Sequence, residues 1–179
     1  MRYIHRELTV DAHSVDPEHI IIPIRDIEGN LHPGSLQQGW SETDSVYIPD
    51  HQIVEQCRLM LQQRDNVVYE NSNYAMNIAA VDSTFFHFFH YPVAAGEAHL
   101  DAPGDAIITQ HYARNIFGKE NPIGKVLEYC GKNITIKGVI GELGCKSLLR
   151  FDLLVSYRLV EHWQRMDISL MRILSLIHI

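Results

Sequence analysis

Histidine is the residue type that most strongly suggests chemistry in this sequence, because eleven occur among 179 residues. His87 and His90 are three residues apart, so one turn of helix would bring both imidazoles to the same face. A zinc site needs three or four ligands, and no carboxylate lies between Ser83 and Gly96 to join the pair. The sequence also lacks an HExxH motif. We therefore interpret both residues as partly exposed histidines beside a buried turn, and we predict no metal site.

Other groups that could act in catalysis form no recognisable arrangement. The pairs His13/His19 and His99/His111 lack a ligand spacing, and no GxSxG motif marks a nucleophile. Acid–base pairs could be formed by four aspartates, but any sequence supplies many such pairs by chance. These aspartates are Asp11, Asp16, Asp82 and Asp101. Asp82 is better explained as the N-cap of the turn that follows it, with Ser83 or Thr84 as alternatives. We predict no catalytic residue, no cofactor and no enzymatic activity.

Two further features also favour structural interpretations. The segment 118–125 contains Gly and Lys as a phosphate loop does, but Val126 follows Lys125 where Ser or Thr is required. Pro122 and Gly124 are therefore expected to shape a turn, with Lys125 in solvent. Three cysteines occur, at positions 57, 130 and 145. A disulfide between the last two could form in an oxidising compartment, but free thiols are the favoured interpretation because nothing places their Cβ atoms together.

The elements around these residues are clearest between positions 81 and 140. Four phenylalanines within residues 85–89 predict a deeply buried helical turn. Residues 106–108 are a short apolar run suited to a buried strand, and residues 112–117 repeat at helical spacing before Gly118, a good C-cap. Residues 126–130 and 134–140 are expected to form a hairpin. Ile134 and Ile136 alternate with Thr135 and Lys137, so one face of this hairpin is expected to contact water.

The flanking segments supply further strands and helices. We expect a first strand at 19–24, a turn at 28–30 with a hairpin back through Leu31, and a loop at 32–48 anchored by Trp40. Apolar residues on one helical face predict a helix over 51–63 with Asp50 as its N-cap. Strands are expected at 66–69, 76–81 and 151–157, a loop at 141–146, and a helix start at 160–163. The irregular interleaving indicates an α+β fold in which helices pack on a mixed β-sheet.

Composition excludes some classes of partner. The chain is 46% hydrophobic and 21% charged, which is ordinary for a globular domain, and its net charge is -7 with no basic block. This charge argues against nucleic acid or an anionic membrane surface as the main partner. No run approaches the roughly 20 apolar residues of a membrane helix, and residues 1–7 do not form a signal peptide. Taken alone, these features indicate a soluble cytoplasmic protein.

The order of the segments suggests a different context. Val81-Asp82 precedes the aromatic turn, and Pro92 and Gly96 follow it. AIIT follows at 106–109, and the helical segment then contains Ala113 and Phe117-Gly118. NPIGK at 121–125 and Gly138-Val139 come after it. This pattern resembles the periplasmic core domain of MacB/FtsX-type ABC transporter permeases, and NPIGK is its most specific part. Glu7-Leu8 with Asp11 and His13, and FDLLVS at 151–156, resemble the outer segments of that domain, so the similarity extends over most of residues 3–163.

The resemblance implies a non-catalytic extracytoplasmic domain, with Met1 as an internal start just after a first membrane helix. It implies a full-length permease in the cell inner membrane and a domain in the periplasm. The implied partners are an ATP-binding subunit or domain, a second permease copy and a periplasmic adaptor. The domain would couple ATP-driven motion to export of a substrate or to partner proteins. The loops at 32–48 and 141–149 are the expected contact surfaces.

The end of the chain departs from this pattern. Residues 168–179 are apolar, and the terminal LSLIHI resembles the translation of a sequencing adapter. We therefore expect a partial core domain at 3–167 and a non-native tail at 168–179; the alternative is a genuine short amphipathic helix. Two alternatives for the function are a stand-alone hydrolase, in which His87 and His90 converge with a carboxylate in a pocket, and a sensor with an enclosed apolar pocket.

Overall fold

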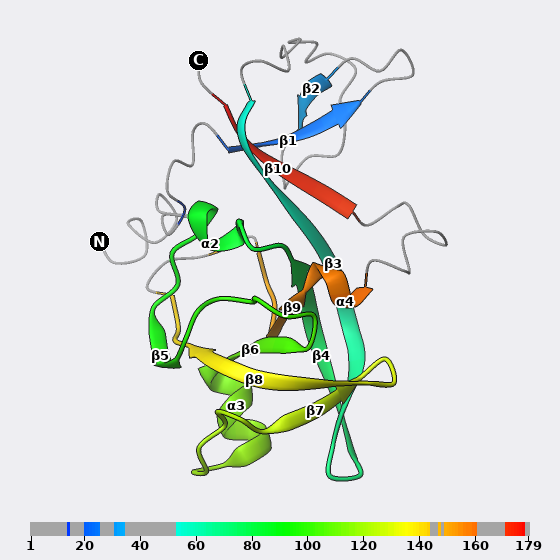
Figure 1. Cartoon of the computed structure of the whole chain (residues 1–179), viewed down its shortest axis with the longest axis vertical. Coiled ribbons are helices and arrows are strands. Elements are labelled where there is room, and N and C mark those ends of the chain that lie inside the picture. Colours follow the sequence, from blue (N-terminus) through cyan, green and yellow to red (C-terminus); the bar gives the residue numbers. More distant parts are fainter. Residues whose placement is uncertain are drawn as a thin grey trace, which may run out of the picture.

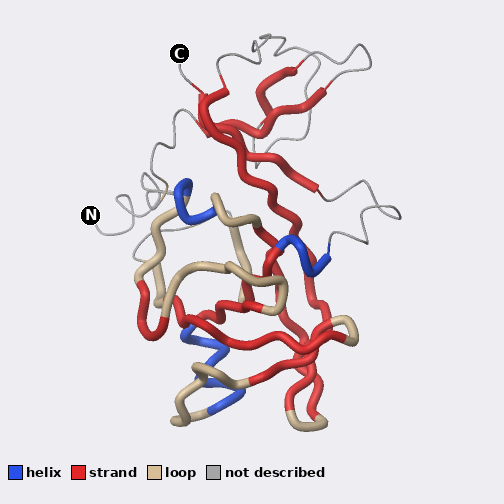
Figure 2. The backbone as a smooth tube through the Cα atoms, viewed as in Figure 1, coloured by secondary structure: helices blue, strands red, loops and turns tan. Residues whose placement is uncertain are grey.

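A computed structural model describes residue 14 and residues 20–25, 31–34, 53–143, 147, 149–160 and 171–177, with side chains for residues 14, 57–143, 147 and 149–160. Within these ranges the backbone forms a ten-stranded sheet (Figures 1 and 2). The sheet order is β2-β1-β10-β3-β4-β9-β6-β8-β5, and β7 pairs with both β3 and β8. The parallel pairs β4/β9 and β6/β8 lie among antiparallel neighbours. The predicted α+β fold with a mixed sheet is therefore confirmed.

The outer part of the sheet consists of three strands. β1 (Ile20–Arg25) and β2 (Leu31–Gly34) pair antiparallel, which confirms the predicted strand and hairpin. β10 (Met171–Ile177) lies between β1 and β3, antiparallel to both. This segment is a strand, so the alternative of a short amphipathic helix there is wrong. Because β10 connects the β1–β2 hairpin to β3, the three strands continue the sheet above the core in Figure 1.

The helix predicted at 51–63 is wrong, because β3 (Ile53–Tyr69) occupies this segment as a long strand. Leu59 belongs to one hydrophobic cluster and Met60 to another, so apolar side chains are buried on both faces of the strand. A strand that is buried on both faces loses its strict alternation, and a short apolar pattern then fits a helix equally well. Pairing with β10 on one edge and β4 on the other decides in favour of a strand.

β3 and β4 (Ser72–Val81) form a hairpin that includes the strands predicted at 66–69 and 76–81. Glu70 and Asn71 have φ values of 46° and 69°, as in the two-residue turns whose twist matches that of the strands. Between Gln62 and Asp65 the register shifts, and Arg64 has a φ of 53°. This bulge bends β3. Beyond it, Val67 and Val68 also pair with β7.

The aromatic turn and the strands after it agree with the sequence analysis. α2 (Phe85–Phe88) buries Phe85 and Phe88, and β5 (Val93–Gly96) forms an edge of the sheet. β6 (Asp105–Thr109) leads into α3 (Gln110–Phe117), which Gly118 caps. β7 (Val126–Tyr129) and β8 (Lys132–Ile140) form the predicted hairpin. In β8, Ile134 and Ile136 are buried and Lys137 is exposed, which confirms the wet face there.

Asp82 differs slightly from its predicted role. Thr84 occupies the N-cap position of α2, without a side-chain capping bond. Asp82 instead accepts hydrogen bonds through Oδ1 from the Thr84 backbone N–H (3.2 Å) and hydroxyl (2.7 Å). Its Oδ2 accepts from the Arg58 backbone N–H at 2.8 Å. Asp82 therefore attaches the beginning of the aromatic turn to β3.

The final elements of the core begin and end at other residues than expected. β9 (Leu153–Ser156) is shorter than the predicted strand at 151–157, and α4 (Tyr157–Val160) starts before the predicted helix start at 160. The loop predicted at 32–48 is wrong over residues 32–34, because these residues pair with β1 as part of β2. The rest of that loop lies outside the described ranges, as do Asp50 as an N-cap, the Trp40 anchor, Cys145 and Trp163.

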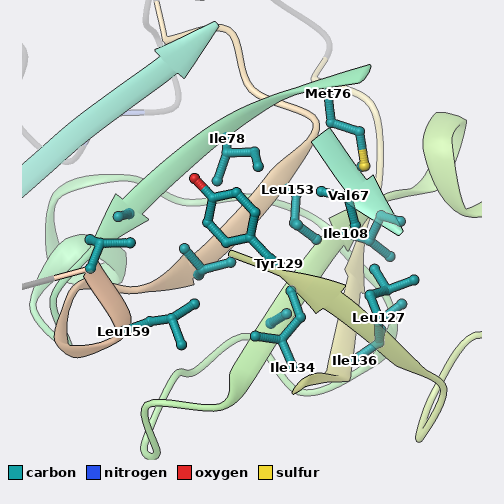
Figure 3. Packing of buried hydrophobic residues seen from close by; sticks show 14 of the residues in the cluster. Val67, Met76, Ile78, Ile108, Leu127, Tyr129, Ile134, Ile136, Leu153 and Leu159 are labelled. Carbon is teal, nitrogen blue, oxygen red and sulfur yellow. The ribbon is translucent and has the colours of Figure 1, made fainter. Parts of the chain in front are cut away.

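The core consists of two hydrophobic clusters, one on each face of the sheet. The first cluster includes the side chains labelled in Figure 3: Val67, Met76, Ile78, Ile108, Leu127, Tyr129, Ile134, Ile136, Leu153 and Leu159. α3 adds Ala113 and Phe117 to this cluster. The second cluster contains Ile107, Ile140 and Leu154 from the opposite face, together with Phe85, Phe88 and Phe89. α3 and α2 therefore cover opposite faces of the sheet.

Candidate functional site

The histidines singled out in the sequence do not form a site among the described residues. His87, His90, His99 and His111 are all exposed. Nε2 of His99 lies 3.1 Å from carboxylate oxygens of both Glu97 and Asp101, on the surface. No group of three or more His, Cys, Asp or Glu side chains in the described ranges could hold a metal ion. His87 and His90 also do not line the groove described below, so the hydrolase alternative gains no support here.

The cysteines that the structure describes are free thiols. Cys57 is buried in the second cluster, and Cys130 lies in the turn between β7 and β8. Burial and, to a smaller extent, the nearby Asp65 carboxylate raise the pKa of Cys130 to about 11, although Tyr129 and Lys132 act in the opposite direction. A high pKa leaves little thiolate at neutral pH, so this thiol is a poor nucleophile.

The NPIGK segment forms the turn between α3 and β7. Gly124 has a φ of 83°, and its N–H donates to Ile136 O at 2.8 Å. The Lys125 ammonium donates to Glu120 Oε2 at 2.6 Å. The hydrogen bond to Glu120, followed by that to Tyr69, raises the pKa of Lys125. Pro122 and Gly124 therefore shape a turn as predicted, whereas Lys125 is ion-paired rather than simply solvated.

A groove of about 470 Å³ lies among the described residues. This volume lies within the roughly 300–1,000 Å³ that is typical of ligand sites. Its lining comes from the ends of β6 and β8, the start of α3, and the segments 141–143 and 149–152. The loop 141–149, predicted as a contact surface, thus contributes Gly141, Glu142, Leu143 and Leu149 to it.

The topology of the sheet explains why a groove forms there. β6 and β8 are adjacent parallel strands, and their last residues, Thr109 and Ile140, both line the groove. The chain leaves β6 into α3, on the face of the first cluster. After β8, it reaches Leu149 and Phe151, which pack into the second cluster on the other face. Where connections from neighbouring parallel strands leave to opposite faces, a crevice opens outside their carboxyl ends.

Asp152 is a half-buried residue of the groove lining and connects three strands. Its backbone N–H donates to Asn77 O, and the Asn77 N–H donates to its carboxylate Oδ2, both at 2.7 Å. Its carbonyl oxygen accepts from the Thr109 N–H at 3.0 Å. The carboxylate is therefore held in place between β4 and β6, just before β9. The pKa of Tyr112 is raised by burial and, secondarily, by the Asp152 charge.

The remaining lining separates into an aromatic wall and a charged rim. Tyr91 and Phe151 lie edge to face with ring centroids 5.4 Å apart, and Phe85 stacks on Tyr91 at 6.0 Å. Glu142, Arg150 and His111 are exposed, whereas Asp152 is half-buried. The groove can therefore surround the apolar part of a ligand and present one shielded carboxylate to a polar group on the same ligand. Because part of the lining is exposed, the groove differs from the enclosed apolar pocket expected of a sensor.

Sequence reasoning missed the main residues of this groove. Asp152 lies within FDLLVS at 151–156, which was noted only for its resemblance to the permease domain. Asn77 and Tyr91 carried no signal, because their contribution depends on which strands become neighbours.

The comparisons with known proteins agree with the fold. The family model of the MacB-like periplasmic core domain matches residues 18–175. No curated protein matches the chain. Among the described helices, none is both long and apolar enough to cross a membrane.

Three solved structures share the fold at low sequence identity. The first is a domain of a permease protein from Porphyromonas gingivalis, with a TM-score of 0.60 and 18% sequence identity. The matched region covers 72% of this chain and 57% of the Porphyromonas gingivalis chain. The periplasmic region of MacB from Actinobacillus actinomycetemcomitans has a TM-score of 0.53 and 16% sequence identity, and the matched region covers 70% of this chain and 58% of the MacB chain. The extracellular domain of the noncanonic ABC-type transporter YknZ from Gram-positive bacteria has a TM-score of 0.55 and 14% sequence identity, and the matched region covers 72% of this chain and 67% of the YknZ chain. The match thus spans less than two thirds of the first two structures. The family model matches residues 18–175, which is most of the chain, and the solved structures share its fold. This chain therefore belongs to the family of MacB-like periplasmic core domains.

Proposed function

We propose that this domain is a non-catalytic extracytoplasmic part of an ABC permease. It couples ATP-driven motion to the export of a substrate or to partner proteins. The observation that carries the proposal is the family match over residues 18–175. The full-length permease would lie in the cell inner membrane, with this domain in the periplasm. Its partners would be an ATP-binding subunit or domain, a second permease copy and a periplasmic adaptor.

The fold supports a mechanical role. β3 is shared by the outer strands and the core, since β10 pairs with its first half and β4 and β7 with its second half. Hydrogen-bonded ladders thus join the outer strands to the core in one sheet, which supports a role in passing displacement from one end of the sheet to the other. The described residues also offer a groove, which suits a domain that binds a partner.

The location is tested by labelling intact cells that express the full-length permease. Glu128 is exposed on β7, so a Glu128→Cys variant offers a thiol on the surface of the domain. A maleimide that does not cross the inner membrane is expected to label this variant in intact cells. A Leu127→Cys variant, in which the thiol is buried, is the matched control and is expected to remain unlabelled. Both variants also carry Cys130→Ser and Cys145→Ser, because the native Cys130 is itself exposed. Labelling of Glu128→Cys only after lysis would contradict an extracytoplasmic location.

The coupling role requires a second experiment, on the purified permease with its ATP-binding subunit. A permease that lacks this domain is expected to keep its ATP hydrolysis and to lose export. Loss of both activities would show that the domain is needed for assembly instead. Export that persists without the domain would contradict the proposal.

A further inference from the structure

The charge distribution inside the groove selects the kind of ligand. Among the half-buried or buried residues of the lining, only Asp152 carries a formal charge; the others are polar and neutral or apolar. Its Oδ2 accepts from the Asn77 N–H at 2.7 Å, and its Oδ1 has no hydrogen-bond partner among the described residues. A shielded carboxylate with an available oxygen favours a cationic donor, because charge-assisted hydrogen bonds are roughly twice as strong as neutral ones.

Basic side chains of the lining do not reverse this preference. Arg150 and His111 are both exposed, and the charge of Arg150 is opposite in sign to that of the exposed Glu142. Interactions with exposed charges are weakened by water and salt, whereas the half-buried Asp152 is screened less. The cation would therefore be recognised at the half-buried Asp152 and not at the exposed charges.

The aromatic wall indicates what carries this cation. Tyr91 and Phe151 lie edge to face, and Phe151 directly precedes Asp152 in the chain. Both rings line the groove, together with the apolar Ile140 and Leu149. Aromatic faces attract ammonium and guanidinium groups, and apolar walls cover a methylene stem. Glu142 and Arg150 of the lining are exposed, so the backbone of a bound segment could continue along the surface beside them.

From these observations we infer that the groove between α3 and the segments 141–143 and 149–152 binds a peptide segment of a partner protein. A lysine or arginine side chain of this segment enters the groove, donates to Asp152 Oδ1 and packs against Tyr91 and Phe151. This inference rests on the proposed function, because it names the chemistry of a partner outside the membrane. It can fail while that function holds, since the following test measures binding alone.

The test is an NMR titration of the 179-residue chain with the peptide acetyl-Ala-Leu-Lys-Leu-Ala-amide. Amide signals of Asn77, Gly141 and Asp152 are expected to shift, and those of the β7–β8 turn are not. A peptide with norleucine in place of lysine keeps the apolar stem without the charge. It is expected to bind at least about tenfold more weakly, in line with the loss of one hydrogen bond to a charged group.

Two protein variants assign the effect to the carboxylate. In Asp152→Asn the side-chain oxygen can still accept from the Asn77 N–H, and binding of the lysine peptide is expected to fall by about tenfold. Glu128→Gln changes the net charge equally on exposed β7, outside the lining, and is expected to leave binding unchanged. Hexylammonium, a small cation without a peptide backbone, is expected to bind at least about tenfold more weakly than the lysine peptide.

Several results would overturn the inference. Equal affinity for the lysine and norleucine peptides would remove the role of the charge, as would unchanged binding by Asp152→Asn. An equal loss of binding in Glu128→Gln would indicate a general effect of the protein's net negative charge. If hexylammonium binds as tightly as the lysine peptide, the groove is a site for small amphipathic cations and not for a partner protein.

Discussion

At the scale of single residues, two glycines decide how β5 approaches β8. Gly138 is buried, and a Cβ atom there would overlap the backbone carbonyl of Glu97. Gly96 has a φ of 68°, and a Cβ atom would overlap the carbonyl of Lys137. The two backbones therefore lie too close for any side chain. The sequence resemblance included both glycines, and the structure supplies the physical reason for them.

We expect Gly138→Ala to lower the free energy of unfolding by about 1–3 kcal/mol, because the obstacle is backbone that cannot rotate away. Urea denaturation measures this loss. Gly141→Ala is the matched control, since its Cβ atom would lie 3.5 Å from Pro92 Cγ, an ordinary contact. A loss in the control as large as that in Gly138→Ala would show that the close approach at β5 is not the cause.

The Cys130 thiol provides a prediction about pH. Its pKa is raised to about 11, so its alkylation by iodoacetamide is expected to reach half its maximal rate near that pH. An unperturbed cysteine would do so near pH 8.5. Mass spectrometry of the chain and of a Cys130→Ser variant isolates this thiol from the others. Half-maximal alkylation near pH 8.5 would mean that the turn leaves the thiol fully solvated.

The same shift has a consequence for stability. Because the folded state holds the Cys130 proton more tightly than the unfolded state, it binds more protons between the two pKa values. This contribution to stability is fully present below the unfolded pKa. It is lost as pH rises towards about 11. Cys130→Ser is expected to remove this part of the pH dependence.

At the scale of elements, β3 shows where local sequence is ambiguous. Residues 53–61 have an apolar pattern that fits a helix, yet they form a strand paired on both edges. The bulge at Arg64 lets the second half of β3 turn towards β7, where the Tyr129 hydroxyl donates to Asp65 Oδ2 at 2.9 Å. The length of this strand is decided by its partners and not by its own residues.

β10 is the element that tests the predicted domain boundary. We propose that the core folds without residues 168–179, because both described clusters lie within residues 57–160. A chain ending at residue 167 is expected to unfold cooperatively in urea with nearly the same midpoint. Its amides at positions 53–58 are expected to exchange faster, since β10 is their ladder partner. Amides of β6 within the core are the internal reference.

Loss of cooperative unfolding in the shortened chain would contradict the boundary at 168. It would show that β10 is an integral strand. The family match to residue 175 and the pairing of β10 with β1 and β3 are the observations that make this test informative.

At the scale of the whole molecule, net charge limits the range of partners. The chain carries -7 at neutral pH, so we expect no binding to duplex DNA at physiological salt. Fluorescence anisotropy of a labelled duplex measures this directly. Lowering the salt concentration is the critical step, because a hidden basic surface would then bind more tightly. An increase in anisotropy at low salt would contradict the prediction.

The sequence alone determined the elements that depend on neighbours along the chain. The aromatic turn, the β6 run, α3 with its Gly118 cap, the NPIGK turn and the β7–β8 hairpin carry strong local signals from phenylalanine, proline and glycine. The order of these segments was also sufficient to suggest the family, which the match over residues 18–175 confirms.

Only the tertiary structure decided what depends on residues far apart in the sequence. Asn77 and Asp152 come together because β4 and β9 pair in parallel, and Tyr91 joins them because its ring packs on Phe151. β3 is a strand because β10 and β4 supply hydrogen bonds on both of its edges, and this outweighs the weak helical preference of its sequence. Propensity acts between nearby residues, whereas strand pairing and the shape of a groove depend on the whole chain.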